Sequence, residues 1–129
     1  MKAITVRQPW AHAIVHLGKT VENRTWKSSY RGPLLIHAAS TMTREEYRRF
    51  AEFMEEERIG RVPNRHELQL GGIIGMAEMV ACVSASTSRW FFGPNAFVLR
   101  NAKPVPFIPM PGRLNLFDVD PAMLKKVAA

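Results

Sequence analysis

Short apolar stretches, each followed by glycine, proline or a polar turn, recur along the whole chain and leave little room for long helices. Alternating or β-branched residues predict strands over residues 2–8, 20–26, 34–39, 71–83, 96–100, 105–108 and 113–119. Gly75 is a candidate for a bulge in the longest of them. Many short, punctuated strands favour a small barrel. The predicted fold class is therefore α+β: a small β-barrel of about six strands with peripheral short helices.

Three segments predict these short helices. The first spans about residues 9–17, beginning at a proline and ending before a glycine. Thr43 and Glu46 form the capping-box pattern of a second helix, which runs to about residue 57. Residues 121–127 predict the third.

Length and composition limit the class of protein. A chain of 129 residues with 47% hydrophobic residues predicts one domain over 1–129 with a real core. One cysteine, Cys82, excludes an internal disulfide and fits a reducing compartment. No apolar run approaches the roughly 20 residues that span a bilayer, and the N-terminus leads directly into a strand pattern. We expect a cytoplasmic monomer without a membrane segment.

The charge of the chain favours a polyanionic partner. The formal net charge is +7, although many basic proteins merely have solvated surfaces. The excess of positive charge is largest in residues 1–31, where one acid, Glu22, and several aromatic residues stand among six cations. The cations are Lys2, Arg7, Lys19, Arg24, Lys27 and Arg31. Cations hold phosphate and aromatic faces stack on bases, so this mixture suits a nucleic acid or a nucleotide.

Two carboxylates fall on predicted strands, Glu22 and Glu78. Glu78 has apolar neighbours on both sides, and a buried carboxylate needs a cation or several donors. Lys19 or Arg24 could supply that partner. The result would be either a structural ion pair that closes the barrel or a polar site at its mouth.

Several aromatic residues are candidate walls of such a site. Trp90 follows Arg89 in a loop with two phenylalanines, where it would be either a stacking platform or part of the core. Trp10 and Tyr30 lie among the N-terminal cations. His37, in a predicted buried strand, is either a core histidine or a site residue.

Metal and cofactor motifs are weak in this sequence. His12 and His16 are spaced i, i+4, but no nearby cysteine or carboxylate supplies a third ligand. The chain has no Walker loop, GxGxxG or GxSxG motif. We therefore expect no metal and no cofactor.

The sequence resembles the ASCH domain family, whose members adopt a PUA-like β-barrel. The matching motifs are Gln8-Pro9-Trp10-Ala11, Gly18 to Trp26, Tyr30 to Ala38, Gly72 to Glu78, Trp90 to Pro94 and Gly112 to Phe117. The resemblance covers nearly the whole chain, and its first two motifs are specific.

The resemblance implies a cleft for RNA or a nucleobase. Some members of the family look like ribonucleases, and a shorter related class looks like amidohydrolases that act on N4-acetylcytidine with a Lys, a Thr and a Glu. By motif, the Lys falls on Lys19 and the strand Glu on Glu78. The Thr position falls on Glu22, which is a departure from that pattern.

The leading interpretation is that a basic cleft binds RNA or a nucleotide derived from it, with ribonuclease activity as an extension. The alternatives are an amidohydrolase that deacylates a modified nucleoside and a non-catalytic interaction module. A deep pocket would favour the nucleoside, and an open groove would favour RNA. The candidate catalytic residues are Lys19, Glu22 and Glu78. The candidate ligand-binding residues are Arg7, Gln8, Trp10, Arg24, Tyr30, Arg31, His37, Arg89 and Trp90.

Overall fold

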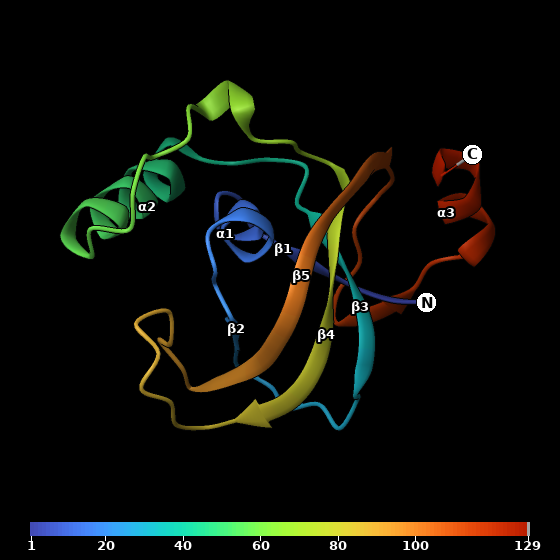
Figure 1. The fold of residues 1–129 in the computed structure, drawn as a ribbon, viewed down its shortest axis with the longest axis horizontal. Coiled ribbons are helices and arrows are strands. Elements are labelled where there is room, and N and C mark those ends of the chain that lie inside the picture. Colours follow the sequence, from blue (N-terminus) through green and yellow to red (C-terminus); the bar gives the residue numbers. More distant parts are fainter. Residues whose placement is uncertain (129) are drawn as a thin grey trace.

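Six strands form one strongly curved, mixed sheet in the computed structural model, which describes the backbone of residues 1–128 and the side chains of residues 1–124. The strand order is β2-β5-β4-β3-β1-β6. The strands are β1 (Lys2–Val6), β2 (Val21–Arg24), β3 (Gly32–Ala38), β4 (Gly72–Val83), β5 (Asn95–Pro109) and β6 (Leu116–Asp118). β1 and β3 are parallel, and the other neighbours are antiparallel. The sheet curls into a half-barrel (Figure 1), so the predicted α+β fold is confirmed.

Helix α1 (Trp10–His16) lies inside the curve of the sheet (Figure 1). Its residues Ala11, Ile14 and Val15 pack with the inner side chains of β1, β3 and β4 in one hydrophobic core. Trp10, at the start of this helix, and residues 22–24 of β2 line one cavity. This arrangement positions the candidate site described below.

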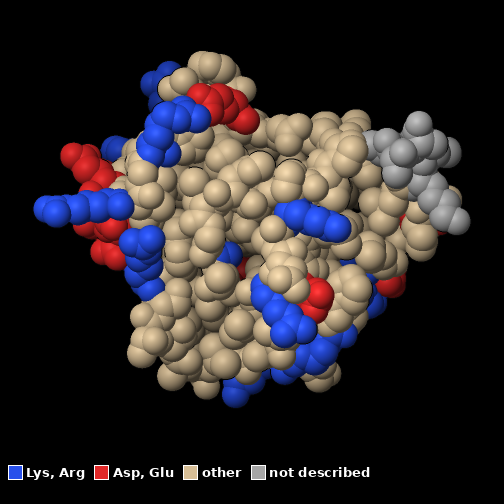
Figure 2. Space-filling model, viewed as in Figure 1, with Lys and Arg blue, Asp and Glu red and all other residues tan. Residues whose placement is uncertain are grey.

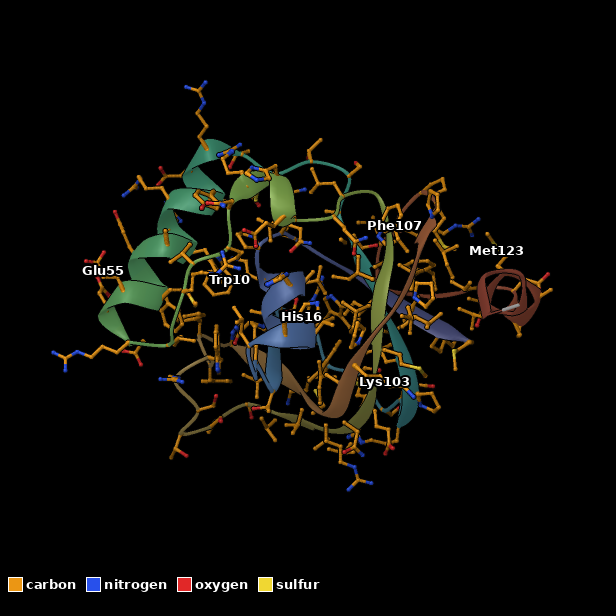
Figure 3. All side chains as sticks on the ribbon, turned by 45° about the horizontal axis from the view of Figure 1, so that its top comes forward. Trp10, His16, Glu55, Lys103, Phe107 and Met123 are labelled. Carbon is orange, nitrogen blue, oxygen red and sulfur yellow. The ribbon has the colours of Figure 1, made fainter. Side chains whose placement is uncertain are left out.

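Helix α2 (Arg44–Glu56) lies outside the sheet and covers α1. The predicted capping box is present, since Thr43 Oγ1 accepts from the Glu46 backbone N–H and Glu46 accepts from that of Thr43. Trp10 lies between α1 and α2 (Figure 3), with its ring centroid 5.0 Å from that of Phe50. Acidic side chains gather on the outer surface of α2 (Figure 2).

The C-terminal half of the sheet differs from the prediction in two respects: the predicted strand over 113–119 is limited to Leu116–Asp118, and two other predicted strands are one. Residues 96–100 and 105–108 belong to one strand, β5, which pairs with β4 as far as Pro109. Prolines are tolerated there because β2 pairs only with residues 95–98, so that the far part of β5 is an edge. A register shift between Ile73 and Gly75 of β4 confirms the predicted bulge. A short 3-10 turn (Arg65–Glu67) and helix α3 (Pro121–Ala128) complete the elements.

Among residues 1–128, the helices are all too short or too polar to cross a bilayer.

Candidate functional site

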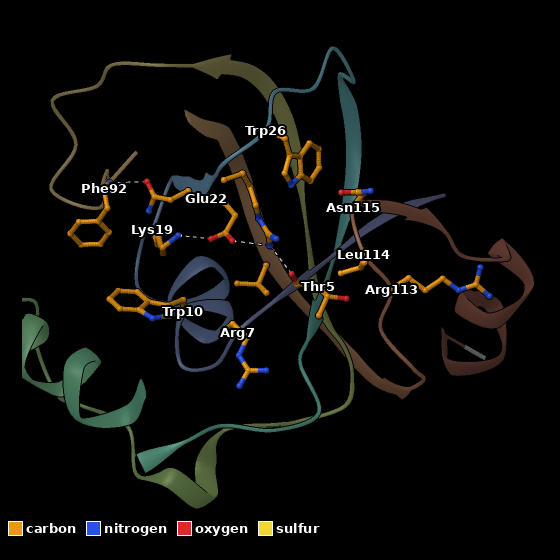
Figure 4. Close-up of a pocket in the computed structure, with 13 residues that line it drawn as sticks. Thr5, Arg7, Trp10, Lys19, Glu22, Trp26, Phe92, Arg113, Leu114 and Asn115 are labelled. Atoms are coloured by element: carbon orange, nitrogen blue, oxygen red, sulfur yellow. Dashed lines mark hydrogen bonds and ion pairs between the residues drawn. The ribbon is translucent and has the colours of Figure 1, made fainter. Parts of the chain in front are cut away.

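A cavity of about 550 Å³ opens on the concave side of the sheet, between β1, β2 and two loops (Figure 4). Four of its lining residues are cationic, one is acidic, and three are aromatic. The lining residues are Thr5, Val6, Arg7, Trp10, Lys19, Glu22, Asn23, Arg24, Trp26, Phe92, Arg113, Leu114 and Asn115. The volume falls in the range of about 300–1,000 Å³ that is usual for small-molecule sites.

A chain of ion pairs forms the floor of this cavity. The Nζ of Lys19 lies 2.8 Å from Glu22 Oε1 and also donates to the backbone oxygen of Val21. On the other side, Arg24 Nη2 lies 3.0 Å from Glu22 Oε2. The Lys19 side chain is 2% exposed and that of Glu22 is 11% exposed. One carboxylate therefore bridges two cations almost out of contact with bulk water.

The local backbone explains why these three side chains meet. Gly18 has a φ of 76°, in the region that favours glycine, and it ends α1 so that the chain turns back at Lys19. Glu22 and Arg24 then alternate with Asn23 on β2, so both point to the same face of the strand.

Arg24 connects this floor to the neighbouring strand. Its Nη2 also donates to the backbone oxygen of Thr5 on β1, at 2.6 Å. Its Nε is buried and has no hydrogen-bond partner among the described residues. Most buried donors in proteins are paired, so the Arg24 guanidinium has hydrogen-bonding capacity that the fold does not use.

Three aromatic side chains form the walls. Trp10 contacts Phe92 edge-on, with ring centroids 6.1 Å apart, and Trp26 packs edge-on against Phe97 of the core. Phe92 is 60% exposed although its ring contacts those of Trp10 and Phe53. An exposed ring in a fixed position at the mouth of a cavity is suited to stacking on a flat ligand.

Asn23 fixes the loop that carries Phe92. Its Oδ1 accepts from the backbone N–H groups of Phe92 and Gly93, at 2.7 and 3.0 Å. Its Nδ2 donates to the backbone oxygen of Trp90 at 3.0 Å. Because all three bonds go to backbone atoms of one loop, Asn23 holds the loop that carries Phe92 against β2, the strand that carries Glu22 and Arg24.

The rim carries two further arginines. Arg7 forms a two-pronged ion pair with Glu46 of α2, with both bonds at 2.7 Å. The guanidinium of Arg7 lowers the pKa of Glu46 from 4.5 to about 2. Arg113 forms no hydrogen bond or ion pair with any side chain that the structure describes. Beside it, Leu114 is 89% exposed.

A family model for the ASCH domain matches residues 4–110 of the chain. This chain belongs to the ASCH domain family. The family has a PUA-like fold and is often proposed to bind RNA.

Solved structures of ASCH proteins share this fold. The ASCH protein of Zymomonas mobilis superposes with a TM-score of 0.61 at 18% identity, covering 98% of this chain and 92% of that chain. A Tyr-to-Phe and a Ser-to-Ala variant of that protein give TM-scores of 0.56 and 0.55 at 19% identity, covering 98% of this chain and 95% and 93% of those chains. At such identities the likeness establishes the fold alone. No curated protein matches this ASCH domain in sequence.

Five of the residues predicted for the site do line the cavity of this ASCH domain: Arg7, Trp10, Lys19, Glu22 and Arg24. The predicted mixture of cations, aromatic rings and one acid is therefore brought together by the fold.

Glu78 does not join them, so the prediction of one polar site with Lys19, Glu22 and Glu78 is wrong in its geometry. On β4 the inward positions around it are Ala77 and Met79, which are buried in the core. Glu78 points to the opposite, outer face, where its side chain is 44% exposed and pairs with Arg100 at 3.2 Å. The apolar neighbours that indicated burial face the other side of the strand.

Trp90 is a core residue, and the prediction of a stacking platform at that position is wrong. It is 3% exposed and packs with Phe53 of α2 and Trp10. Two residues further along the same loop, Phe92 has the exposure expected of the platform. Arg89 lies outside the cavity and donates to the backbone oxygen of Glu57.

The remaining predicted binding residues do not line this cavity. Gln8 is fully buried, accepting from the His12 N–H and donating to the Gln69 oxygen. Tyr30 donates to the backbone oxygen of Pro33 at 2.5 Å, and Arg31 donates to carbonyls of its own loop. His37 is also buried, but it lines a smaller hollow next to the cavity.

Sequence reasoning missed Thr5, Val6, Asn23, Trp26, Phe92, Arg113, Leu114 and Asn115. Trp26 shares the face of Glu22 and Arg24 by simple alternation, which is a signal that could have found it. Arg113, Leu114 and Asn115 come from a segment about 90 residues away from β2 in the sequence. No local pattern links these two segments, because only the closure of β6 onto β1 brings them together.

Proposed function

We propose that this ASCH domain binds RNA and that one nucleobase enters the cavity. A single observation carries the proposal: aromatic walls and a floor of ion pairs line one cavity of about 550 Å³. Aromatic rings stack on bases, and buried donors and acceptors read base edges. A cavity built only for an apolar ligand would not bury two charged side chains, Lys19 and Glu22, at its floor.

Each part of the cavity has a separate role in this proposal. The exposed ring of Phe92 stacks on the base, and Trp10 and Trp26 close the sides. The floor offers the partly exposed Arg24 guanidinium and the remaining lone pairs of the Glu22 carboxylate to the edge of the base. The rim cations attract the phosphate backbone, chiefly Arg113, which pairs with no side chain that the structure describes.

A titration of labelled single-stranded RNA tests this proposal. Affinity should fall with salt, with a log–log slope of about 0.7 per phosphate contact. Phe92→Ala should weaken binding by about 1–3 kcal/mol and leave the melting temperature nearly unchanged, because the ring is 60% exposed. Leu70→Ala is the matched control, since Leu70 is also an exposed apolar residue but does not line the cavity.

Two results would contradict RNA binding in the cavity. One is a flat salt dependence, or no binding at low salt. The other is an equal loss of affinity in Phe92→Ala and Leu70→Ala, which would place the ligand elsewhere.

A second candidate function is hydrolysis of an acyl group from a modified nucleoside such as N4-acetylcytidine. The contact between Lys19 and Glu22 at the floor favours it, because a carboxylate beside an ammonium group can serve acid–base chemistry. Glu22 would take a proton from water as the oxygen attacks the acyl carbon, and Lys19 would stabilise the oxyanion. The C–N bond then breaks, the proton passes to the nitrogen, and acetate and cytidine leave. Glu78, on the outer face, takes no part.

Release of acetate from N4-acetylcytidine, measured beside cleavage of a labelled RNA, tests this second function. Lys19→Met should abolish turnover, whereas Lys19→Arg should retain some, because guanidinium keeps the positive charge. If Arg is as inactive as Met, the reaction needs a neutral amine at residue 19 and the roles above are wrong. If the unaltered protein has neither activity across a broad range of pH and metal ions, the site is non-catalytic.

A further inference from the structure

The segment between Met110 and β6 forms one side of the cavity mouth. Its residues Arg113, Leu114 and Asn115 line the cavity opposite Phe92 (Figure 4). Residues 111–115, here called the lip, are all exposed and lie outside the helices and strands. They form no hydrogen bond with any residue that the structure describes. The position of the lip therefore depends on its two ends and on packing against its neighbours.

The sheet holds the C-terminal end of the lip. Leu116 of β6 pairs with Ile4 of β1, and the pairing of these two strands stops there. One residue further along β1, the backbone oxygen of Thr5 accepts from Arg24, a residue of the cavity floor. The lip thus leaves the sheet at the part of β1 that borders the cavity.

His37 and the backbone of Gly71 hold the N-terminal end of the lip through Met110. The Nε2 of His37 lies 2.7 Å from the backbone oxygen of Met110, and the Met110 N–H donates to the Gly71 oxygen. Because a carbonyl oxygen only accepts, Nε2 is the donor, and in the neutral ring Nδ1 accepts from the hydroxyl of Thr5 at 3.2 Å. The His37 ring is 1% exposed, so both of its bonds are made away from bulk water.

His37 contacts this segment from the outer face of the sheet. On β3 it alternates with Ile36 and Ala38, which belong to the core around α1. Its ring packs instead against Phe117 of the outer core, with ring centroids 5.9 Å apart. His37 does not line the cavity, so it can influence a ligand there only through the lip.

Gly112 allows the lip to lie against this histidine. A Cβ at Gly112 would come within 2.6 Å of Thr5 Oγ1 and 2.9 Å of His37 Cε1. Both distances are too short for a Cβ, so a side chain at this position would push the lip away from the ring. The hydrogen bond to Met110 and the close packing at Gly112 together place the lip beside His37.

We infer that His37 is a positioning residue for the cavity: from the outer face it holds the lip so that Arg113 and Leu114 stand at the mouth. This inference rests on the proposed function for the identity of the ligand. A loop without such an anchor has to be ordered at each binding event, and the lost conformational entropy opposes binding. A lip that is already in place avoids that loss and raises affinity.

A spin label on the lip tests whether His37 holds it. Cys82→Ser removes the one native cysteine, and Leu114→Cys places the label at a residue that is 89% exposed. His37→Leu removes both ring hydrogen bonds and should make the label more mobile in electron paramagnetic resonance. His37→Gln should leave the mobility nearly unchanged, because its amide can still donate to the Met110 oxygen. Met54→Ala is the control, since it opens a space in a core cluster of buried residues that does not include the lip.

Binding of labelled single-stranded RNA tests what the position of the lip does for the ligand. Arg113→Ala should weaken binding about fivefold in the otherwise unaltered protein, because a cation at the mouth is lost. In the His37→Leu background the same change should cost less than about twofold, because the arginine is no longer held there. In the Met54→Ala background it should again cost about fivefold, so a general loss of stability cannot imitate the result.

The outcomes separate this inference from the proposed function. Equal mobility of the label in the unaltered protein and in His37→Leu would overturn the inference. So would additive effects of His37→Leu and Arg113→Ala on RNA affinity, or no effect of Arg113→Ala at all, while RNA binding itself would stand. If no RNA binds even at low salt, the proposed function is wrong, and the mobility of the label alone decides whether His37 holds the lip.

Discussion

The floor of the cavity and the outer face of the sheet use the same residue types in opposite ways. On the floor, Glu22 bridges Lys19 and Arg24, with the Lys19 and Glu22 side chains 2% and 11% exposed. On the outer face, Glu78 pairs with Arg100, with side chains 44% and 65% exposed. Removing one partner of a buried pair leaves an uncompensated charge, whereas exposed pairs contribute little. We therefore expect the ion pairs on the floor to contribute much more to stability than the pair on the outer face.

Replacement of Glu22 by Gln should have the largest effect. Gln keeps the shape of the side chain but leaves both floor cations without a counter-charge. The free energy of unfolding should fall by about 3 kcal/mol, a large part of the 5–15 kcal/mol typical of a domain. Urea unfolding at neutral pH measures this loss. A loss below about 1 kcal/mol would show that water solvates the Lys19 and Arg24 cations well enough to replace the carboxylate.

Replacement of Lys19 by Met should cost less than replacement of Glu22. Glu22 keeps its second partner, since Arg24 Nη2 remains 3.0 Å from Oε2. Methionine also fills the volume of the lysine stem with apolar atoms. We expect a loss of about 1–2 kcal/mol in the same urea experiment. The reverse order of the two variants would mean that Arg24 does not share the charge of Glu22.

The rim pair of Arg7 and Glu46 lies between the two extremes, with side chains 48% and 26% exposed. The pKa of Glu46 is lowered from 4.5 to about 2 in the folded protein by its bonds to Arg7. Because the folded pKa is the lower one, the contribution of the pair is complete above pH of about 4.5 and is lost as the pH falls toward 2. Solvent screening limits it to about 1 kcal/mol.

Glu46→Gln isolates that contribution, because Gln at the same position keeps the capping box of α2. The unaltered protein should be more stable than this variant at pH 7, and the difference should vanish near pH 2. A difference that stays constant with pH would assign the effect to the helix cap rather than to the ion pair.

Local patterns in the sequence predict the helices and most strands well. They do not predict which segments that are far apart in the sequence lie next to each other. The capping box at Thr43 and the bulge near Gly75 depend on neighbouring residues, and both are present. The continuous β5 was missed, because whether a proline can sit in a strand depends on whether that strand is an edge. Edge position is a property of the whole sheet.

The site was predicted in part for the same reason. Lys19, Glu22 and Arg24 lie within six residues, and alternation along one strand groups Glu22 with Arg24, whereas Lys19 precedes that strand and reaches them through the turn at Gly18. Glu78 was assigned wrongly, because an apolar sequence on both sides of a strand residue does not say which face that residue takes. Trp90 and Phe92 alternate in one loop, and only the packing of α2 against it decides that Trp90 is buried.

Replacement of Glu78 by Gln should have the smallest effect of all. Its partner Arg100 is 65% exposed, so water solvates the guanidinium once the carboxylate is gone. The free energy of unfolding should change by less than about 0.5 kcal/mol, and added salt should reduce the change further. Because Glu78 does not line the cavity, RNA affinity and any hydrolytic activity should also stay at the level of the unaltered protein. If RNA affinity or hydrolytic activity fell while stability did not, the ligand would reach the outer face of β4. The outer face would then be part of the site, contrary to the contrast drawn between Glu22 and Glu78.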